Sequence, residues 1–263
     1  CKINLGLQVH AKRADGYHEL STCFYPVPLQ DMLEIIRAEK FSFETSGLPM
    51  PGSKEDNLCV KAYSLLMKDF DLAPVQMHLH KSIPVGAGLG GGSSDAAWTL
   101  RGLNRIFGLS LDARRLKMYA AELGSDCSFF VEDRPMLATG RGEILEPLQV
   151  DLNGKLVVIV QPPIHISTAE AYSKIKPHEH DTDLRDILLN FPLSGWKANL
   201  VNDFESSVFE QFPYVERVKE SLYQSGAVYA SLSGSGSAVF GIFEPPLDLS
   251  NTFPESFIWA GMI

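Results

Sequence analysis

Apolar and polar residues alternate from the start of the chain, where Ile3, Leu5, Leu7 and Val9 fall on one face of an extended segment. A period of two residues is typical of a half-buried β-strand, so we predict a strand over residues 2–9. Similar apolar stretches predict further strands at 20–27, 32–36, 75–80, 156–160, 228–231 and 238–243. Strands are therefore expected along the whole chain.

Other segments show the wider spacing of a helix. Asn57 is a good N-cap for a helix that runs to about residue 70, with Val60, Tyr63, Leu66 and Met67 facing the core. Further helices are predicted at 93–107, 111–124, 183–189 and 204–225. Helices and strands mix without a strict βαβ order, which favours an α+β fold. We expect two domains, residues 1–150 and 151–263, with the boundary in an irregular stretch near residue 150.

The composition is that of an ordinary folded protein, with 45% hydrophobic and 21% charged residues among 263. The formal net charge of -9 argues against sequence-independent nucleic-acid binding. No apolar run approaches the roughly 18 residues that a membrane span needs. The four cysteines are scattered without the spacing of a zinc site. We therefore expect reduced thiols, a cytoplasmic location, and no nucleic-acid or membrane partner.

A glycine-rich segment lies between the strand predicted at 75–80 and the next helix. It consists of Pro84, Val85, Gly86, Ala87, Gly88, Leu89, Gly90, Gly91, Gly92, Ser93 and Ser94. Glycine permits positive φ and close backbone approach, so consecutive N–H groups can point at an anion. The helix N-terminus adds partial positive charge, and Ser94 is a candidate Mg²⁺ ligand. The segment therefore predicts a phosphate-binding loop.

Three known kinds of phosphate loop can be compared with this segment. A Walker A loop needs a lysine after the glycines, and none follows here. Gly86, Gly88 and Gly91 fit the G-x-G-x-x-G pattern of dinucleotide-binding turns, although the preceding region is not a βαβ unit. A protein-kinase loop needs H-R-D and D-F-G segments downstream, and neither occurs. By itself the loop does not separate an ATP kinase from a dinucleotide enzyme.

Three segments, in order along the chain, resemble the signatures of the GHMP kinases (galactokinase, homoserine kinase, mevalonate kinase and relatives). Residues 1–7 are similar to the N-terminal P-x-x-K-x-N-L-x-L strand, 84–94 to the glycine loop, and 231–240 to the C-terminal glycine-rich segment. Cys1 departs from the small residue that is usual at its position. The resemblance implies a two-domain fold, ATP as phosphoryl donor, and an active site in the interdomain cleft. Mg²⁺ is expected because MgATP is the usual phosphoryl donor.

Two residues are candidates for catalysis. From sequence alone, Lys2 is an edge-strand lysine, and Asp126 is a turn residue at a helix–strand junction before Phe129. In the GHMP subfamily whose acceptor is a cytidine diphosphate-linked methylerythritol, a lysine in the first signature and an aspartate in a G-A-D-V-P-F-F-like segment form the catalytic pair. The resemblance implies that Asp126 accepts the hydroxyl proton, while Lys2 orients the carboxylate and offsets charge on the phosphoryl group.

The segment 13–20 points to the acceptor. Asp15 and Gly16 predict a hairpin turn, which Tyr17 and His18 follow directly. An aromatic face can stack on a nucleobase, and a histidine can read its edge. The run R-A-D-G-Y-H-E-L resembles the same subfamily. That resemblance implies cytosine stacking on Tyr17, a hydrogen bond from His18, and Asn4 near the erythritol hydroxyls.

Further substrate contacts are expected from the second half of the chain. Thr168 and Tyr172 resemble a threonine and an aromatic residue that contact the nucleotide end. From sequence alone, Thr168 is a helix N-cap, and Tyr172 packs into the core one turn later. The C-terminal signature adds Gly234, Ser235 and Gly236 to the expected substrate site.

The resemblance implies ATP-dependent phosphorylation of the 2-hydroxyl of that acceptor, in non-mevalonate isoprenoid precursor synthesis. On the ATP side, Asn57 resembles an asparagine near the adenine. A second interpretation is another GHMP kinase acting on homoserine, a sugar or mevalonate, which Tyr17 and His18 disfavour. A third is a non-catalytic nucleotide sensor, disfavoured because Lys2 and Asp126 are both present.

Overall fold

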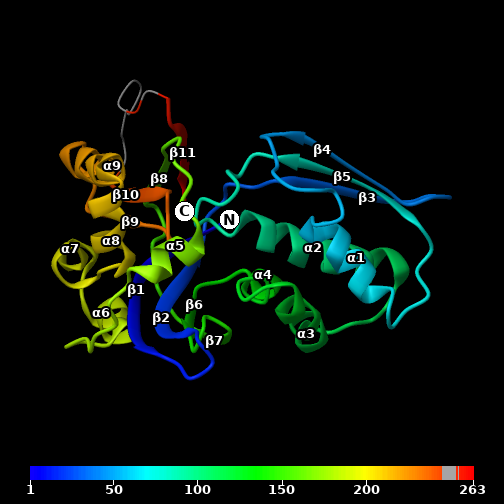
Figure 1. The fold of residues 1–263 in the computed structure, drawn as a ribbon, viewed down its shortest axis with the longest axis horizontal. Helices are drawn as coiled ribbons and strands as arrows, with labels where there is room; N and C mark the ends of the chain where they lie inside the picture. Colours follow the sequence, from blue (N-terminus) through cyan, green and yellow to red (C-terminus); the bar gives the residue numbers. More distant parts are fainter. Residues whose placement is uncertain (245–252, 254) are drawn as a thin grey trace. The chain divides into compact units, whose positions relative to one another are not determined.

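The computed structural model describes residues 1–244, 253 and 255–263, which form two compact units. Unit 1 consists of Cys1, Leu29–Val85 and Gly90–Arg134, and unit 2 of Lys2–Pro28, Gly86–Leu89 and Pro135–Ile263. Both units mix helices with strands, which confirms the predicted α+β class (Figure 1). The units differ from the expected division at residue 150 because the N-terminal hairpin pairs with a strand that begins at Met136. The division at residue 150 stays a prediction.

Unit 1 is a three-stranded sheet with helices beside it (Figure 1). The strands are β3 (Met32–Arg37), β4 (Ser42–Gly47) and β5 (Val75–Lys81), in the order β3-β5-β4, with β3 antiparallel and β4 parallel to β5. The helices are α1 (Leu58–Leu66), α2 (Gly91–Phe107), α3 (Ala113–Leu123) and α4 (Phe129–Glu132). The central helix, α2, packs against α1, α3, α4 and β3 and buries Ala96, Leu100 and Leu103.

Unit 2 contains two four-stranded antiparallel sheets. The first has the order β1-β2-β6-β7, with β1 (Lys2–Lys12), β2 (His18–Pro26), β6 (Met136–Thr139) and β7 (Ile144–Pro147). The second has the order β11-β8-β10-β9, with β8 (Leu156–Gln161), β9 (Tyr229–Leu232), β10 (Val239–Phe243) and β11 (Phe257–Met262). The helices are α5 (Thr168–Ser173), α6 (Leu184–Asn190), the 3₁₀ turn η1 (Leu193–Gly195), α7 (Trp196–Asn199), α8 (Phe204–Gln211) and α9 (Pro213–Gln224). Apolar residues of β1, β8, α8 and α9 form one core cluster.

The predicted strands and most predicted helices are present, with three differences. The helix predicted over 204–225 is two helices, because Pro213 has no N–H to donate and instead begins α9. The segment after Asp126 was expected to be extended, but its aromatic residues form α4. Strands β4, β6, β7 and β11 were not predicted; they are only four to six residues long.

The apolar residues of β1 do not all lie on one face, as simple alternation predicted. Leu5 opposes Cys23 on β2, whereas Leu7 opposes Thr22. One extra residue, Gly6 with φ of 69°, is therefore inserted between them as a bulge. Because neighbouring residues of β2 point to opposite faces, Leu5 and Leu7 do so too. The prediction of one common apolar face is wrong, and β1 is buried on both sides.

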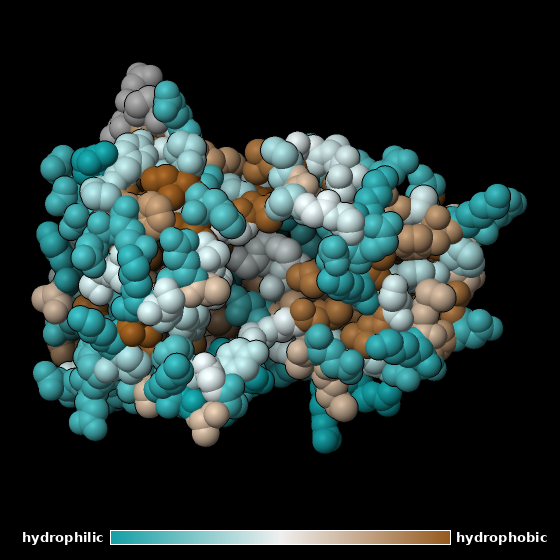
Figure 2. Space-filling view, viewed as in Figure 1, coloured by the Kyte–Doolittle hydropathy of each residue, from teal (hydrophilic) through white to brown (hydrophobic). Residues whose placement is uncertain are grey.

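The surface seen in Figure 2 is mostly hydrophilic, with hydrophobic residues in small patches. This distribution is normal for folded domains. Within the described part of the chain, no helix has both the length and the apolar content needed to cross a membrane.

Candidate active site

The glycine segment joins β5 to α2. Helix α2 begins at Gly91, two residues before its predicted start at Ser93. Gly86, Gly88 and Gly90 have φ of 68°, 82° and 69°, a conformation in which other residues are strained. The N-cap position of α2 is glycine and makes no side-chain capping bond. The first N–H groups of α2 therefore suit an anionic ligand.

The middle of the loop packs tightly against the C-terminal glycine-rich turn, within unit 2. The Ser233 hydroxyl donates to the Gly88 carbonyl at 3.0 Å, and the Ala238 N–H donates to the Ala87 carbonyl at 3.1 Å. A Cβ at Gly88 would lie 2.0 Å from the Ser233 carbonyl oxygen. Only glycine fits at this position, so two signature segments far apart in sequence form one compact structure.

The side chain of Lys2 lies beside this structure and is 3% exposed. Its ammonium donates to Asn4 Oδ1 at 2.6 Å and to the Gly88 carbonyl at 2.9 Å, and it lies 5.1 Å from the centre of the Phe24 ring. Asn4 in turn donates to the Thr22 hydroxyl at 2.9 Å. Lys2 is thus a buried, oriented cation at the loop, which contrasts with the edge-strand lysine that the sequence alone predicts. A charge in this position can offset negative charge on a phosphate.

Asn202, which the sequence did not suggest, supports the same turn. Its amide nitrogen donates to the carbonyls of Leu232 and Gly234 at 2.8 and 2.9 Å, and its Oδ1 accepts from the Phe204 N–H at 3.1 Å. The side chain is 2% exposed. Gly236, like Gly234, has positive φ, and Ser235 between them is partly exposed. A buried asparagine therefore holds the backbone of the turn that contacts the loop.

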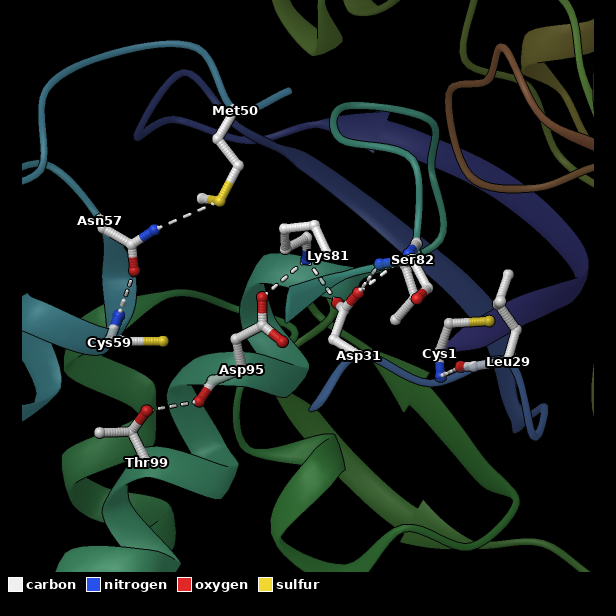
Figure 3. Close-up of polar contacts among 11 residues, drawn as sticks. Cys1, Leu29, Asp31, Met50, Asn57, Cys59, Lys81, Ser82, Asp95 and Thr99 are labelled. Carbon is white, nitrogen blue, oxygen red and sulfur yellow. Dashed lines mark hydrogen bonds and ion pairs between the residues drawn. The ribbon is translucent and has the colours of Figure 1, made fainter. Parts of the chain in front are cut away.

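In unit 1, a buried charge cluster holds both ends of the loop (Figure 3). Lys81, the last residue of β5, donates to Asp31 at 2.5 Å and to Asp95 at 2.7 Å. Asp31 also accepts the N–H groups of Ser82 and Ile83, at 2.6 and 2.9 Å. Asp95 lies on α2. The cluster of Asp31, Lys81 and Asp95, called the clamp below, therefore joins the residues that precede the loop to the helix that follows it.

The clamp contains two carboxylates and one ammonium out of water. Burial raises the pKa of Asp95 to about 7; the charge of Asp31 also raises it, and the charge of Lys81 opposes the shift. For Lys81, burial lowers the pKa, but the two carboxylates outweigh burial, so its pKa is raised. Lys81 is therefore charged at neutral pH, and its function here is to neutralise the clamp.

Asp126 lies in the turn between α3 and α4, so the junction is helix–helix and not the predicted helix–strand. The turn begins at Gly124, which caps α3 as predicted. Burial raises the pKa of the next thiol, Cys127, to about 11, while a hydrogen bond with Ser93 opposes the shift. That hydrogen bond places the turn beside the first turn of α2. Asp126 and the partly exposed Ser94 thus belong to neighbouring turns of unit 1.

Asn57 is the N-cap of α1, as predicted. Its Oδ1 accepts from the Cys59 N–H at 2.8 Å, and its Nδ2 faces the Met50 sulfur at 4.0 Å (Figure 3). The side-chain oxygen of Asn57 is therefore occupied by the capping hydrogen bond of α1. The amide nitrogen is the group left to serve the predicted adenine contact.

The predicted substrate hairpin joins β1 to β2 through the turn at Asp15 and Gly16. Tyr17 is 57% exposed, and the Arg141 guanidinium lies 4.7 Å from the centre of its ring. His18 instead stacks on Tyr172, with ring centres 5.0 Å apart and planes at 21°. Burial, with a smaller contribution from the charge of Lys12, lowers the pKa of His18, so its imidazole is neutral at neutral pH. The structure brings His18 and Tyr172 together.

Helix α5 carries the other two predicted substrate residues. Its N-cap is Ser167, whose hydroxyl accepts from the Glu170 N–H at 3.1 Å, so the prediction of Thr168 as N-cap is wrong by one residue. Thr168 is the first residue of the helix and is exposed. Tyr172 packs partly against the core of unit 2, with Phe204 at its edge. Both residues lie on one short helix, as expected from their spacing.

Comparison with known proteins decides the family. The model of the GHMP kinases N terminal domain matches residues 57–133, and that of GHMP kinases C terminal matches residues 183–252. A 4-diphosphocytidyl-2-C-methyl-D-erythritol kinase of Cytophaga hutchinsonii is 51% identical, over 97% of this chain and 92% of its own length. This chain belongs to the GHMP kinase family. A Bacteroides fragilis protein of the same name is 51% identical, over 93% of this chain and 90% of its own length.

Solved structures of GHMP kinases agree with this assignment. The crystal structure of a 4-(cytidine 5'-diphospho)-2C-methyl-D-erythritol kinase superposes with a TM-score of 0.80 and 34% identity, over 93% of this chain and 88% of that one. A homoserine kinase from Cytophaga hutchinsonii shares the fold, with a TM-score of 0.65 and 15% identity, over 100% of this chain and 94% of that one. The GHMP fold therefore carries different acceptor specificities.

The residues that hold the signatures in place in this GHMP kinase carry little signal in the sequence. Asp31 lies just before a predicted strand, and Lys81 just after another, where charged residues are ordinarily solvated. Asp95 directly precedes Ala96 and Ala97, and a charged residue beside small apolar ones is the one sequence signal that a buried charge is present. Asn202 next to Asp203 indicates only a helix start.

Proposed function

We propose that this chain transfers the γ-phosphoryl group of ATP to the 2-hydroxyl of 4-diphosphocytidyl-2-C-methyl-D-erythritol. The observation that carries the proposal is the near-complete alignment, at 51% identity, with relatives that bear the name of this kinase. The hairpin with Tyr17 and His18 supports the same acceptor, because it offers an aromatic ring and a neutral imidazole to a nucleobase. We also propose a cytoplasmic location, supported by the four cysteines, which are all free thiols.

In the proposed mechanism, Asp126 accepts the proton of the attacking hydroxyl as the phosphoryl group is transferred. Lys2 offsets the charge that develops on the transferred group and orients the carboxylate. Its contacts with Asn4 and the Gly88 carbonyl support this role, because they hold the ammonium at the loop before any ligand binds. Lys2 belongs to unit 2 and Asp126 to unit 1, and their pairing stays a prediction.

The loop residues 84–94 are proposed to hold the phosphates of ATP through backbone N–H groups, supported by the positive φ angles and the uncapped start of α2. Mg²⁺ prefers oxygen ligands and usually binds one or two protein groups together with substrate phosphates. The Ser94 hydroxyl in the first turn of α2 fits that preference. Bound there, the ion would supply positive charge to the phosphates.

The acceptor is proposed to bind at the hairpin, helix α5 and the C-terminal turn. Tyr17 is exposed and offers a ring face to cytosine, while His18 and Tyr172 form the neighbouring stacked pair. Thr168, Asn4, Gly234, Ser235 and Gly236 complete the proposed substrate residues. Because one base–aromatic stack is worth about 1–3 kcal/mol, Tyr17→Ala should raise the KM for the acceptor several-fold and leave the KM for ATP unchanged. An unchanged acceptor KM would contradict the stacking role.

The experiment that tests the function is ADP release with four acceptors in parallel: the cytidylylated methylerythritol, homoserine, galactose and mevalonate. We expect ADP release with the first acceptor. Turnover with another acceptor and not the first would refute the proposed substrate, and no turnover with any would leave only nucleotide binding.

A matched pair of variants tests whether Asp126 acts as the general base. Asp126→Asn should lower kcat by about 10²–10⁴ with ATP affinity unchanged. Asp112→Asn is the control, because asparagine caps helices as well as aspartate and the bond to the Arg115 N–H can persist. A kcat for Asp126→Asn within about tenfold of wild type would exclude general-base catalysis by this residue.

A further inference from the structure

A group of metal-ligating side chains lies in unit 2, apart from all the residues assigned above. One ligand atom from each of His178, His180 and Asp203 lies within 4.8 Å of the others. The two imidazole rings are 4.2 Å apart between centres, and His180 Nε2 lies 3.0 Å from Asp203 Oδ2. In the part of the chain that the structure describes, this is the one such group of three.

The carboxylate of Asp203 is held toward the histidines by the backbone of β1. Asp203 occupies the N-cap position of α8, yet its side chain makes no capping bond. Instead, Oδ2 accepts from the Val9 N–H at 2.7 Å, and the Asp203 N–H donates to the Leu7 carbonyl at 2.9 Å. Aspartate ordinarily caps helices, but the Asp203 carboxylate instead faces His180. Such bonds to a carboxylate are the outer-shell support that metal ligands usually have.

The histidines are also oriented as metal ligands are. His178 Nδ1 lies 3.3 Å from the Lys176 carbonyl, and the His178 N–H donates to the Val9 carbonyl at 3.2 Å. With the ring hydrogen on Nδ1, the lone pair is on Nε2, which is the usual arrangement of a histidine whose other nitrogen binds a metal.

A structural interpretation without metal explains only part of this group. A hydrogen bond between His180 and Asp203 would fix the segment after α5 on β1. It gives no reason for a second imidazole, on the exposed His178, to lie within reach of the same carboxylate. Metal–ligand bonds of about 2.0–2.1 Å in a tetrahedron place ligand atoms roughly 3.3 Å apart, so a small contraction of the group would close the site.

We propose that His178, His180 and Asp203 bind one divalent transition-metal ion of the Zn²⁺ class. Two imidazoles and a carboxylate suit this class, and the remaining coordination position would be open to water. The ion would join the connection between α5 and α6 to Asp203, which precedes α8 and is hydrogen-bonded to β1. Helix α5 carries Tyr172 and β1 leads into the hairpin with His18, so the ion would brace both chain segments that form that stacked pair.

Other zinc-binding groups interfere little with a binding test. The four cysteines are buried, and burial raises the pKa of Cys23 and of Cys59 to about 12, so their thiolates do not compete in the folded protein. The chain also offers an internal control. His78 and His80 have the same H-x-H spacing, but both contact the Ser46 hydroxyl, at 3.0 and 2.9 Å, and they are not part of a three-ligand group.

The test is a titration of the full chain with Zn²⁺ alone, by calorimetry and by competition with a chromophoric chelator. We expect one equivalent to bind to wild type and to the double variant His78→Ala/His80→Ala. We expect the double variant His178→Ala/His180→Gln to bind at least about tenfold more weakly, because two ligands are lost. The glutamine retains an N–H donor for Asp203, so the metal-free melting temperature checks that the variant is folded. Equal Zn²⁺ affinity in wild type and this variant, loss of binding in the His78/His80 control, or no stoichiometric binding by wild type would each overturn the proposal.

Discussion

Replacement of Lys81 by methionine tests whether the clamp stabilises unit 1. The Lys81 side chain is 1% exposed and is the cation between the carboxylates of Asp31 and Asp95, whose side chains are 3% and 7% exposed. Methionine fills a similar volume without charge or donors. The variant therefore leaves two buried carboxylates without their cation, while little packing is lost.

The magnitude follows from the burial of the cluster. Removing one partner of a buried ion pair costs about 3–5 kcal/mol, because the remaining charge stays out of water. In a chain of this size, each kcal/mol lowers the melting temperature by about 2–4 °C, so we expect a decrease of roughly 6–20 °C at pH 8. At pH 5 the decrease should be smaller, because the pKa of Asp95 is raised to about 7 and this carboxyl is then protonated and uncharged.

The assay is thermal unfolding followed by circular dichroism, with urea unfolding as a second measure. Lys155→Met is the matched control. The Lys155 ammonium lies 2.6 Å from the Glu244 carboxylate, as close as in the clamp, but this ion pair is at the surface, with the two side chains 28% and 62% exposed. Surface pairs contribute about 0–1 kcal/mol, so the control should melt within a few degrees of wild type. If Lys81→Met and Lys155→Met melt at the same temperature, the buried clamp does not stabilise unit 1 more than a surface ion pair does.

Three further predictions concern the same region and the loop. The pKa of Asp95 is raised to about 7 from 3.8, so the stability that Asp95 contributes is present at acidic pH and is lost as pH rises through 7. Asp95→Asn should remove this part of the pH dependence of urea unfolding. Gly88→Ala should prevent folding or abolish activity, because the added Cβ would meet the Ser233 carbonyl. Gly16 has a similar φ but open space around it, so Gly16→Ala should lower the free energy of unfolding, measured by thermal melting, by only about 1–2 kcal/mol. Asn57→Ala should cost about 1 kcal/mol in urea unfolding through loss of the α1 cap, and Asn57→Asp should retain most of it.

Sequence reasoning succeeded where local chemistry determines the structure. The glycine loop could be placed because the positive φ at Gly86, Gly88 and Gly90 favours glycine at all three positions. The hairpin turn at Asp15 and Gly16 follows from turn chemistry alone. The family assignment followed from three such segments in the right order.

The residues that support these segments could not be found in the same way. Asp31 and Asp95 are 64 positions apart in the sequence, and nothing local to either shows that they share one lysine. Asn202 holds a turn that begins 30 residues later, at Leu232. Each contact is a product of tertiary packing. Its only trace in the sequence is a polar residue among apolar neighbours, which is also what an ordinary solvated position looks like.

The bulge in β1 shows how strongly one residue can change such an interpretation. Under strict alternation, Lys2 and Asn4 would lie on the face opposite to Leu7. The extra residue at Gly6 reverses the faces, so Lys2, Asn4 and Leu7 share one face of the sheet. Leu7 belongs to the core cluster of unit 2, and Lys2 contacts the Gly88 carbonyl. Because Gly6 separates the two halves of the strand, β1 can bury Leu7 in that core while it directs a buried ammonium at the glycine loop.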